Sequence, residues 1–284
     1  MNGNKLSFAA ILVICFAIIG AALVLIFSLL VNYGESNEIS VTAPRPQPGT
    51  PQAALVFAPP RPDEAPDNIR DAVVLGYNIL LKTQEYAPEY VGNKLQCTNC
   101  HFDAGRAQKT LSLVGVAVKY PKYRTRSQYS TDLVTRTNGC FQRSMNGKPV
   151  PAASKEMQAI MAYYHWISKG LPIYEEVPWL GLKHLDTDYK GDATKGATVF
   201  QKQCQQCHGV NGEGTLVAPP LWGPGSFNDG AGMSKLENFA AFDHAFMPKN
   251  NPDLTVEESM DVAAFVTSKP RPHFSEKKDP QDVW

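Results

Sequence analysis

The chain has 284 residues, of which 43% are hydrophobic and 19% are charged. This length and composition fit a globular protein with room for two domains of ordinary size. Basic and acidic residues balance at 27 each, so the net charge is zero, which argues against nucleic acid as a partner.

The first element is a run of 24 uncharged residues, 8–31. As a helix, it exceeds the roughly 30 Å hydrocarbon core of a bilayer. A cleaved signal peptide is the alternative, but its apolar region spans only about 7–15 residues. We therefore predict an uncleaved membrane anchor within residues 1–33. Lys5 precedes the run and Glu35 follows it, which places the remaining chain on the periplasmic side of the bacterial inner membrane.

Residues 34–67 contain eight prolines, which prevent a regular helix and favour extended polyproline geometry. We predict a spacer between the anchor and the folded domains. Leu55, Val56 and Phe57 leave an alternative open, in which the second half of the segment packs onto a domain.

Two amphipathic helices are predicted in the next part of the chain. One begins near Ile69, and the other begins after Ser154, a residue suited to cap a helix N-terminus. Each has apolar residues at helical spacing on one face, the first at Ile69, Val73, Tyr77, Leu80 and Leu81, the second at Met157, Ile160, Met161, Tyr164 and Ile167.

Between these helices lies Cys97-Thr-Asn-Cys100-His101. In the C-x-x-C-H pattern the two thiols bind a haem covalently and the histidine ligates its iron. A zinc or thiol-redox motif is the alternative. We predict a haem c bound by Cys97, Cys100 and His101.

The motif recurs as Cys204, Cys207 and His208, and the downstream spacing recurs as well. Cys140 lies thirty-nine residues after His101, and Met247 lies thirty-nine residues after His208. We therefore predict His101 and Cys140 as iron ligands of one haem, and His208 and Met247 as ligands of the other. Met145 is the alternative to Cys140, and His244 is the competitor of Met247.

The second copy begins at Asp192, a predicted helix cap, and closes with a helix that follows the capping-box pattern Thr255-Val-Glu-Glu258. Both copies have the order helix, haem motif, long loop with a distal ligand, and closing helix, and both resemble the cytochrome c fold. The resemblance implies that a carbonyl near Pro219 orients the proximal histidine. We predict an all-α protein with two tandem cytochrome c-like domains, residues 68–183 and 184–284, behind the anchor and the proline-rich linker.

A basic segment surrounds Cys140. Between Lys119 and Lys148 there are seven basic residues and one acidic residue, Asp132. A solvated face is one interpretation, and haem propionates account for two of these charges. A site for highly charged anions is the interpretation we favour, because arginine offers a planar fork to oxyanions.

The pattern Arg126-x9-Arg136-x3-Cys140-x2-Arg143-Ser144 resembles the active-site segment of the dihaem thiosulfate dehydrogenases, which also act as tetrathionate reductases. The resemblance implies an enzyme that joins two thiosulfates as tetrathionate and releases two electrons. It further implies that Cys140 is both a haem ligand and the reactive sulfur, and that Arg126, Arg136 and Ser144 hold the substrate. Gln142 and Arg143 are assigned to the same site. The expected electron acceptor is a small cytochrome c or a quinol-linked carrier.

Two other functions compete with this one. A dihaem electron-transfer subunit without catalysis predicts Met145 as the ligand and leaves the cysteine among arginines unexplained. A sulfur-transfer cytochrome also uses a haem-ligating cysteine, but the dihaem repeat with Met247 argues against it.

Overall fold

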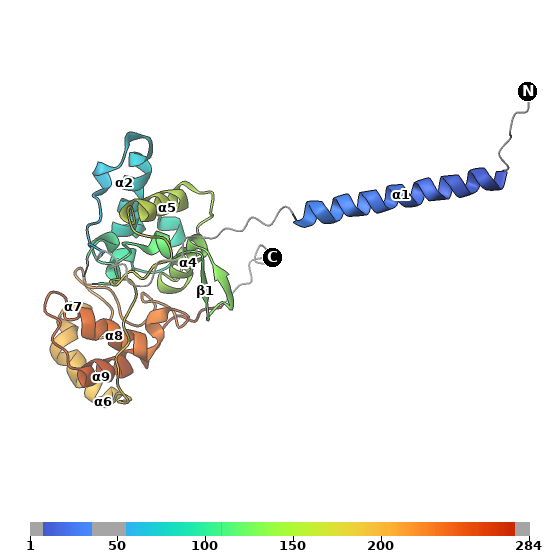
Figure 1. Cartoon of the computed structure of the whole chain (residues 1–284). Coiled ribbons are helices and arrows are strands. Elements are labelled where there is room, and N and C mark those ends of the chain that lie inside the picture. The colour runs from blue at the N-terminus through green and yellow to red at the C-terminus, as the bar shows by residue number, and fades with distance from the viewer. Residues whose placement is uncertain (1–7, 36–54, 109, 276–284) are drawn as a thin grey trace, which may run out of the picture. The chain divides into compact units, whose positions relative to one another are not determined.

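The computed structural model describes residues 8–35, 55–108 and 110–275. The chain divides into two compact units, residues 1–54 and residues 55–284. In the second unit, α2, α4 and α5 form one helical group and α6 to α9 form another (Figure 1). The main elements are α1 (Phe8–Glu35), α2 (Asp67–Leu81), α3 (Thr83–Tyr86), β1 (Lys122–Arg124), β2 (Tyr129–Thr131), α4 (Leu133–Gly139), α5 (Lys155–Ile167), α6 (Ala193–Val199), α7 (Gln205–His208), α8 (Leu236–Phe246) and α9 (Val256–Thr267).

The apolar N-terminal run lies within helix α1. A membrane span needs sufficient length together with sustained hydropathy, and no helix in the described part of the chain combines the two to the degree required. The predicted membrane anchor at residues 8–31 is therefore wrong, and so is the localisation at the inner membrane that depends on it.

The proline-rich segment is described from residue 55 onward, and there it packs onto the first helical group. The Phe57 ring meets Trp179 edge-on, with ring centroids 5.2 Å apart. Trp166 Nε1 donates a hydrogen bond to the carbonyl of Arg61 at 2.8 Å. The alternative in which the second half of the segment packs onto a domain is confirmed. Of the spacer predicted for residues 34–67, residues 36–54 lie outside the described part of the chain.

The first module, for which we keep the predicted range 68–183, is built on the crossing of α2 and α5. Gly76 allows the two helices to approach closely, because a Cβ at this position would collide with the carbonyl of Ala159. The predicted cap of α5 is confirmed, since Ser154 Oγ accepts a hydrogen bond from Met157 N at 3.1 Å. Tyr163 is fully buried at the crossing.

The second module, range 184–284, repeats this arrangement with α6 and α9. Gly196 takes the place of Gly76, because a Cβ there would overlap the carbonyl of Asp261. Both predicted caps are confirmed: Asp192 accepts from the N–H groups at the start of α6, and Thr255 forms a capping box with Glu258. The repeated helix crossing supports the predicted cytochrome c-like fold, while the module boundaries stay a prediction.

The all-α prediction holds in the form of a mostly helical protein, but one hairpin departs from it. Strands β1 and β2 pair antiparallel, with Arg124 opposite Tyr129. Alternating tyrosine and threonine residues favour strand here, within a segment for which the sequence predicted only a basic surface. The hairpin leads into α4, which Asp132 caps by accepting from Thr135 N.

Helix α4 continues into a turn of π-helix, Cys140–Ser144. This turn contains the cysteine and several of the predicted substrate residues. The two modules meet at Phe102. Its ring lies edge-on to Phe242 with centroids 6.3 Å apart, and Lys249 Nζ lies 5.1 Å from the Phe102 centroid.

Candidate haem-binding and substrate sites

The first haem motif forms a short turn, Cys97–Asn99, that leads into His101. His101 Nδ1 lies 2.6 Å from the carbonyl oxygen of Leu111. Because a carbonyl can only accept, Nδ1 carries the proton and Nε2 keeps its lone pair. Thr83 fixes the turn, since its Oγ1 accepts from Cys97 N at 3.1 Å. The residues therefore fit a covalently bound haem whose iron is ligated by His101.

The second motif begins at the last residue of another π-turn, Phe200–Cys204, and continues on α7, with the same histidine arrangement. His208 Nδ1 lies 2.8 Å from the Pro219 carbonyl, the contact that the cytochrome c resemblance implies. Burial lowers the pKa of His208, which favours the neutral imidazole that can ligate a metal. The Cys204 side chain is half-buried and Cys207 is exposed, so one edge of this attachment site lies at the surface.

The fold brings Cys140 next to His101, which lies thirty-nine residues earlier in the chain. Arg136 Nη1 donates to Cys140 Sγ at 2.9 Å. Burial raises the pKa of the Cys140 thiol, but the charge of Arg136 and the hydrogen bond with His101 outweigh burial and lower it to about 6. The sulfur is therefore a thiolate at neutral pH, the form that binds iron and acts as a nucleophile.

The alternative ligand Met145 lies in the hydrophobic core and is 2% exposed. In the second module, Met247 follows α8 and its backbone N–H donates to the Asp243 carbonyl at 2.8 Å. The competitor His244 has the same arrangement as the proximal histidines, with Nδ1 2.9 Å from the Leu254 carbonyl, so this contact leaves its Nε2 available and does not decide between the two residues. The assignment of Cys140 and Met247 as distal ligands stays a prediction.

The predicted substrate residues surround the cysteine to different extents. Gln142, Arg143 and Ser144 share its π-turn and are half-buried. The Arg143 guanidinium lies over Gly139, where a Cβ would collide with it, and 5.7 Å from the Phe274 centroid. Arg126 lies on the exposed hairpin turn and donates to the Gly230 carbonyl at 2.8 Å, so it contacts the second module.

The basic segment is less concentrated than its sequence suggests. Lys119 pairs with Glu176 at 3.3 Å, and Lys148 pairs with Glu89 at 3.7 Å. These acidic partners lie outside the segment, so the sequence could not connect them with it. The positive charge next to the sulfur is that of Arg136.

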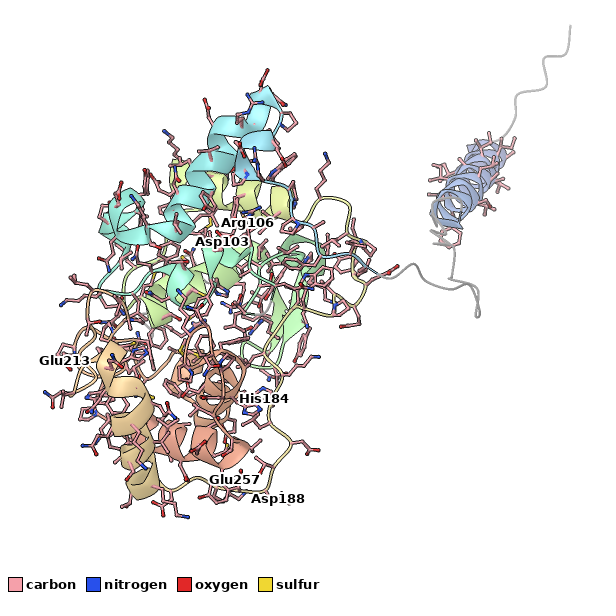
Figure 2. All side chains as sticks on the ribbon, turned by 90° about the vertical axis from the view of Figure 1, so that its left-hand side faces the viewer. Asp103, Arg106, His184, Asp188, Glu213 and Glu257 are labelled. Atoms are coloured by element: carbon pink, nitrogen blue, oxygen red, sulfur yellow. The ribbon has the colours of Figure 1, made fainter. Side chains whose placement is uncertain are left out.

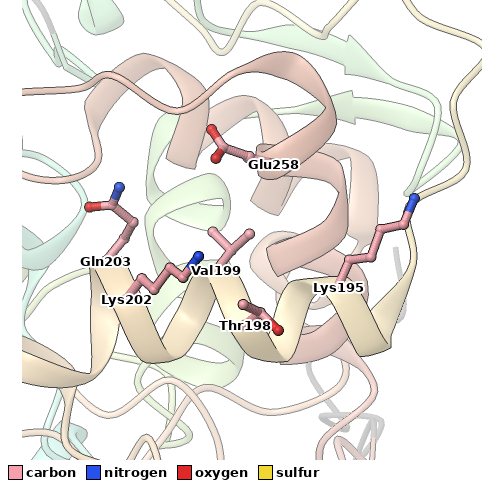
Figure 3. A pocket seen from close by; sticks show the side chains of 6 residues that line it. All are labelled: Lys195, Thr198, Val199, Lys202, Gln203 and Glu258. Carbon is pink, nitrogen blue, oxygen red and sulfur yellow. The ribbon is translucent and has the colours of Figure 1, made fainter.

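Two other polar features lie away from this site. Asp103 and Arg106, seen together in Figure 2, form an ion pair at 3.4 Å in the loop after the first motif. Figure 3 shows a pocket along α6, lined by Lys195, Thr198, Val199, Lys202, Gln203 and Glu258. Lys202 and Gln203 lie on the π-turn that ends at Cys204, but none of the six residues belongs to a C-x-x-C-H motif or to the π-turn of Cys140, so this pocket is not the candidate site.

Sequence reasoning missed several residues that shape the site. Thr83 and the Leu111 carbonyl hold the first motif, and buried Tyr164 has its pKa raised by burial and by the nearby thiols Cys97 and Cys140. Their types are common in cores and loops, and no local pattern distinguishes them. Sequence reasoning also missed Asn228 of the second module, whose side chain donates a hydrogen bond to the Gln142 carbonyl.

Comparison with known proteins is consistent with this geometry. The model of the SoxA/TsdA cytochrome c domain matches residues 86–173. The model of cytochrome c oxidase, cbb3-type, subunit III matches residues 191–266. Thiosulfate dehydrogenase from Thiomonas intermedia (strain K12) is 42% identical over 224 residues, which cover 76% of this chain and 71% of that protein.

The chain belongs to the thiosulfate dehydrogenase family.

Thiosulfate dehydrogenase from Allochromatium vinosum is 35% identical to this family member, with 91% of this chain and 94% of that protein covered. The solved structure of thiosulfate dehydrogenase (TsdBA) from Marichromatium purpuratum is similar with a TM-score of 0.74 and 33% identity. The match covers 79% of this chain and 51% of that one, so the chain spans about half the length of that protein. With two cytochrome c domains and two complete attachment motifs, this thiosulfate dehydrogenase family member binds two c-type haems.

Proposed function

We propose that the chain interconverts thiosulfate and tetrathionate, with two thiosulfate dianions yielding one tetrathionate and two electrons. The observation that carries this proposal is the setting of Cys140, whose sulfur contacts Arg136 and His101. A reactive thiolate beside a guanidinium suits an anionic sulfur substrate. The related proteins named thiosulfate dehydrogenase support thiosulfate as the substrate.

The chain's own groups bind and orient the two anions. Two dianions repel each other, by about 1 kcal/mol for each pair of unit charges 4 Å apart in water and by more at lower effective dielectric. Arg136 and Arg126 offset this repulsion, and Ser144 donates to a sulfonate oxygen. Gln142 and Arg143 lie on the same turn and complete the polar surface.

The reaction divides into two steps at the Cys140 sulfur. First, an S–S bond forms between this thiolate and the sulfane sulfur of one thiosulfate, and two electrons are removed. The sulfane sulfur of the second thiosulfate then attacks the sulfane sulfur of the adduct, so tetrathionate leaves and the Cys140 thiolate returns. Charge balances in both steps and no proton is exchanged. The two haems, when bound, accept the two electrons, one each.

We also infer a division of labour between the modules. Residues 68–183 hold the active-site haem through Cys97, Cys100 and His101, with Cys140 as the distal ligand. Residues 184–284 hold the electron-transfer haem through Cys204, Cys207 and His208, with Met247 as the distal ligand. An external carrier, a small cytochrome c or a quinol-linked protein, exchanges electrons at the second module, where Cys207 is exposed.

The function is tested by thiosulfate-dependent reduction of ferricyanide with the full chain, with tetrathionate measured as the product. Cys140→Gly is expected to abolish turnover while both haems stay bound. Met145→Leu, which conserves volume in the core, is the matched control and is expected to retain activity. A native protein that exchanges electrons with carriers but ignores both sulfur compounds would favour the non-catalytic carrier.

A further inference from the structure

The π-turn that contains Cys140 ends with three consecutive carbonyl groups that its own backbone does not satisfy. Met145 N–H donates to the Cys140 carbonyl, and Gly147 N–H donates to the Phe141 carbonyl. The carbonyls of residues 142, 143 and 144 then come last in the helix, where partners must be supplied from outside.

A single residue of the second module satisfies two of these three carbonyls. Asn228 Nδ2 donates to the Gln142 carbonyl at 2.9 Å, and Asn228 N donates to the Arg143 carbonyl at 3.1 Å. The Ser144 carbonyl accepts from Asn93 Nδ2 at 2.9 Å. The second module therefore provides most of the C-terminal cap for the helix of the catalytic cysteine.

The Asn228 side chain has every polar group engaged. Its Nδ2 also donates to Asn146 Oδ1 at 3.1 Å, and its Oδ1 accepts from Gly230 N at 3.1 Å. The residue is 1% exposed, so water does not replace these bonds. An amide supplies two N–H donors and one acceptor oxygen in this arrangement, and neither a carboxylate nor a hydroxyl offers the same set.

The loop around Asn228 also holds a predicted substrate residue. Arg126 Nη2 donates to the Gly230 carbonyl at 2.8 Å, and the position of Gly230 depends in turn on its bond to Asn228 Oδ1. Asn93 joins the same network, because its Nδ2 donates both to the Ser144 carbonyl and to the Ser226 carbonyl. One loop thus contacts both the π-turn and the hairpin arginine.

We propose that the loop of residues 226–231 is a positioning element for the catalytic segment and that Asn228 is its positioning residue. This inference rests on the proposed function, since it concerns the geometry of the same thiosulfate site. The loop sets where the backbone of residues 142–144 lies and so aligns the Cys140 sulfur with the substrate-binding groups. Misplacement of such groups by about 1 Å costs on the order of a hundredfold in rate.

The test is Asn228→Asp in the full, haem-loaded chain. The substitution keeps the size and the acceptor for Gly230 N, but it places an acceptor-only oxygen against the Gln142 carbonyl and Asn146 Oδ1. We expect kcat/KM for thiosulfate to fall at least about tenfold. We also expect the electron paramagnetic resonance signal of the first ferric haem to shift or broaden without substrate, while that of the second haem is unchanged.

Asn238→Asp is the matched control, because Asn238 Nδ2 donates to the Gly232 carbonyl within the second module. It should behave as the native protein does. Asn228→Ala removes the same donors without adding charge and should act in the same direction as Asn228→Asp. Native kinetics and native haem signals in both Asn228 variants would overturn the proposal. Loss of haem or of folding in both would also overturn it, since the loop would then maintain the fold rather than the site.

The two proposals fail in different ways. If the native chain does not oxidise thiosulfate, the proposed function fails. The resonance signal of the first haem in Asn228→Asp still decides whether the loop positions the π-turn, because this measurement needs no substrate.

Discussion

Arg136→Met tests the charge next to the catalytic sulfur. Arg136 lies one helical turn before Cys140, and its Nη1 donates to the sulfur at 2.9 Å. Methionine keeps the length and the apolar contacts of the arginine stem but removes the donor and the charge. The predicted consequence is a large fall in kcat/KM for thiosulfate with both haems still bound.

The size of the fall in kcat/KM can be estimated in two ways, from the lost hydrogen bond and from the lost thiolate, and both give a similar value. A hydrogen bond to a charged group contributes about 1.5–3 kcal/mol, which corresponds to roughly 10- to 150-fold in rate at 1.36 kcal/mol per decade. Arg136 is also the largest influence lowering the pKa of Cys140 from 9.0 to about 6. At pH 7 a thiol with the higher pKa is about 1% thiolate and one with the lower pKa is about 90%, so the whole shift, to which His101 also contributes, sets an upper bound of about 90-fold.

The assay is initial-rate ferricyanide reduction across a thiosulfate series from pH 6 to pH 9. Because the pKa of Cys140 is lowered in the native chain, its thiolate is complete above about pH 7. In Arg136→Met, activity should instead keep rising toward pH 9. Arg124→Met is the control, since the Arg124 guanidinium donates to Tyr120 Oη. Activity of Arg136→Met within about threefold of native, with the same pH profile, would refute the reasoning.

Three further predictions concern the scaffold. Gly196→Val forces a side chain into the backbone of α9, so we expect the free energy of unfolding to fall by about 1–3 kcal/mol in thermal denaturation, and an unchanged melting temperature would contradict the close approach. Thr83→Val leaves the partly buried Cys97 N–H without its acceptor and should cost about 1–3 kcal/mol, whereas a stability equal to native would show that this bond is dispensable. The Phe274 N–H and His273 lower the pKa of Asp229; stabilisation from this carboxylate is therefore present above its ordinary pKa and lost as pH falls through the lowered value. The protection of the Phe274 amide against hydrogen exchange, relative to its intrinsic rate at each pH, should fall below about pH 4, and protection that stays constant from pH 6 to pH 3 would count against it.

The helices were predictable because their signals are local. Ser154 and Thr255 cap the helices that follow them within three residues, and the apolar faces behind them repeat every turn. The haem motifs were equally local, since each C-x-x-C-H pentapeptide contains the whole attachment chemistry. Cys140 was predicted as an iron ligand because its distance from the first haem motif equals the distance of Met247 from the second.

The features that sequence reasoning missed depend on long-range contacts. Asn228 and Gln142 are 86 residues apart in the chain, and nothing near either residue indicates their bond. Glu89 and Glu176 neutralise lysines of the basic segment from outside it, so a local charge sum overstates the charge at the site. Each strand of the hairpin has only three residues, too short for an alternating pattern to be distinguished within a segment interpreted from its basic residues.

The second module binds the catalytic turn through main-chain oxygens. Main-chain groups are common to all residues, so substitutions at positions 142 and 144 keep these hydrogen bonds, whereas Arg143 also contacts the Phe274 ring of the second module through its guanidinium. Asn228 cannot be substituted in the same way, because its own side chain donates the hydrogen bonds to the Gln142 carbonyl and to Asn146 Oδ1. Evolution of a new substrate preference should therefore leave the second module's loop unaltered while positions 142 and 144 of the turn vary, and a library randomised at those two positions offers an engineering route to related sulfur anions.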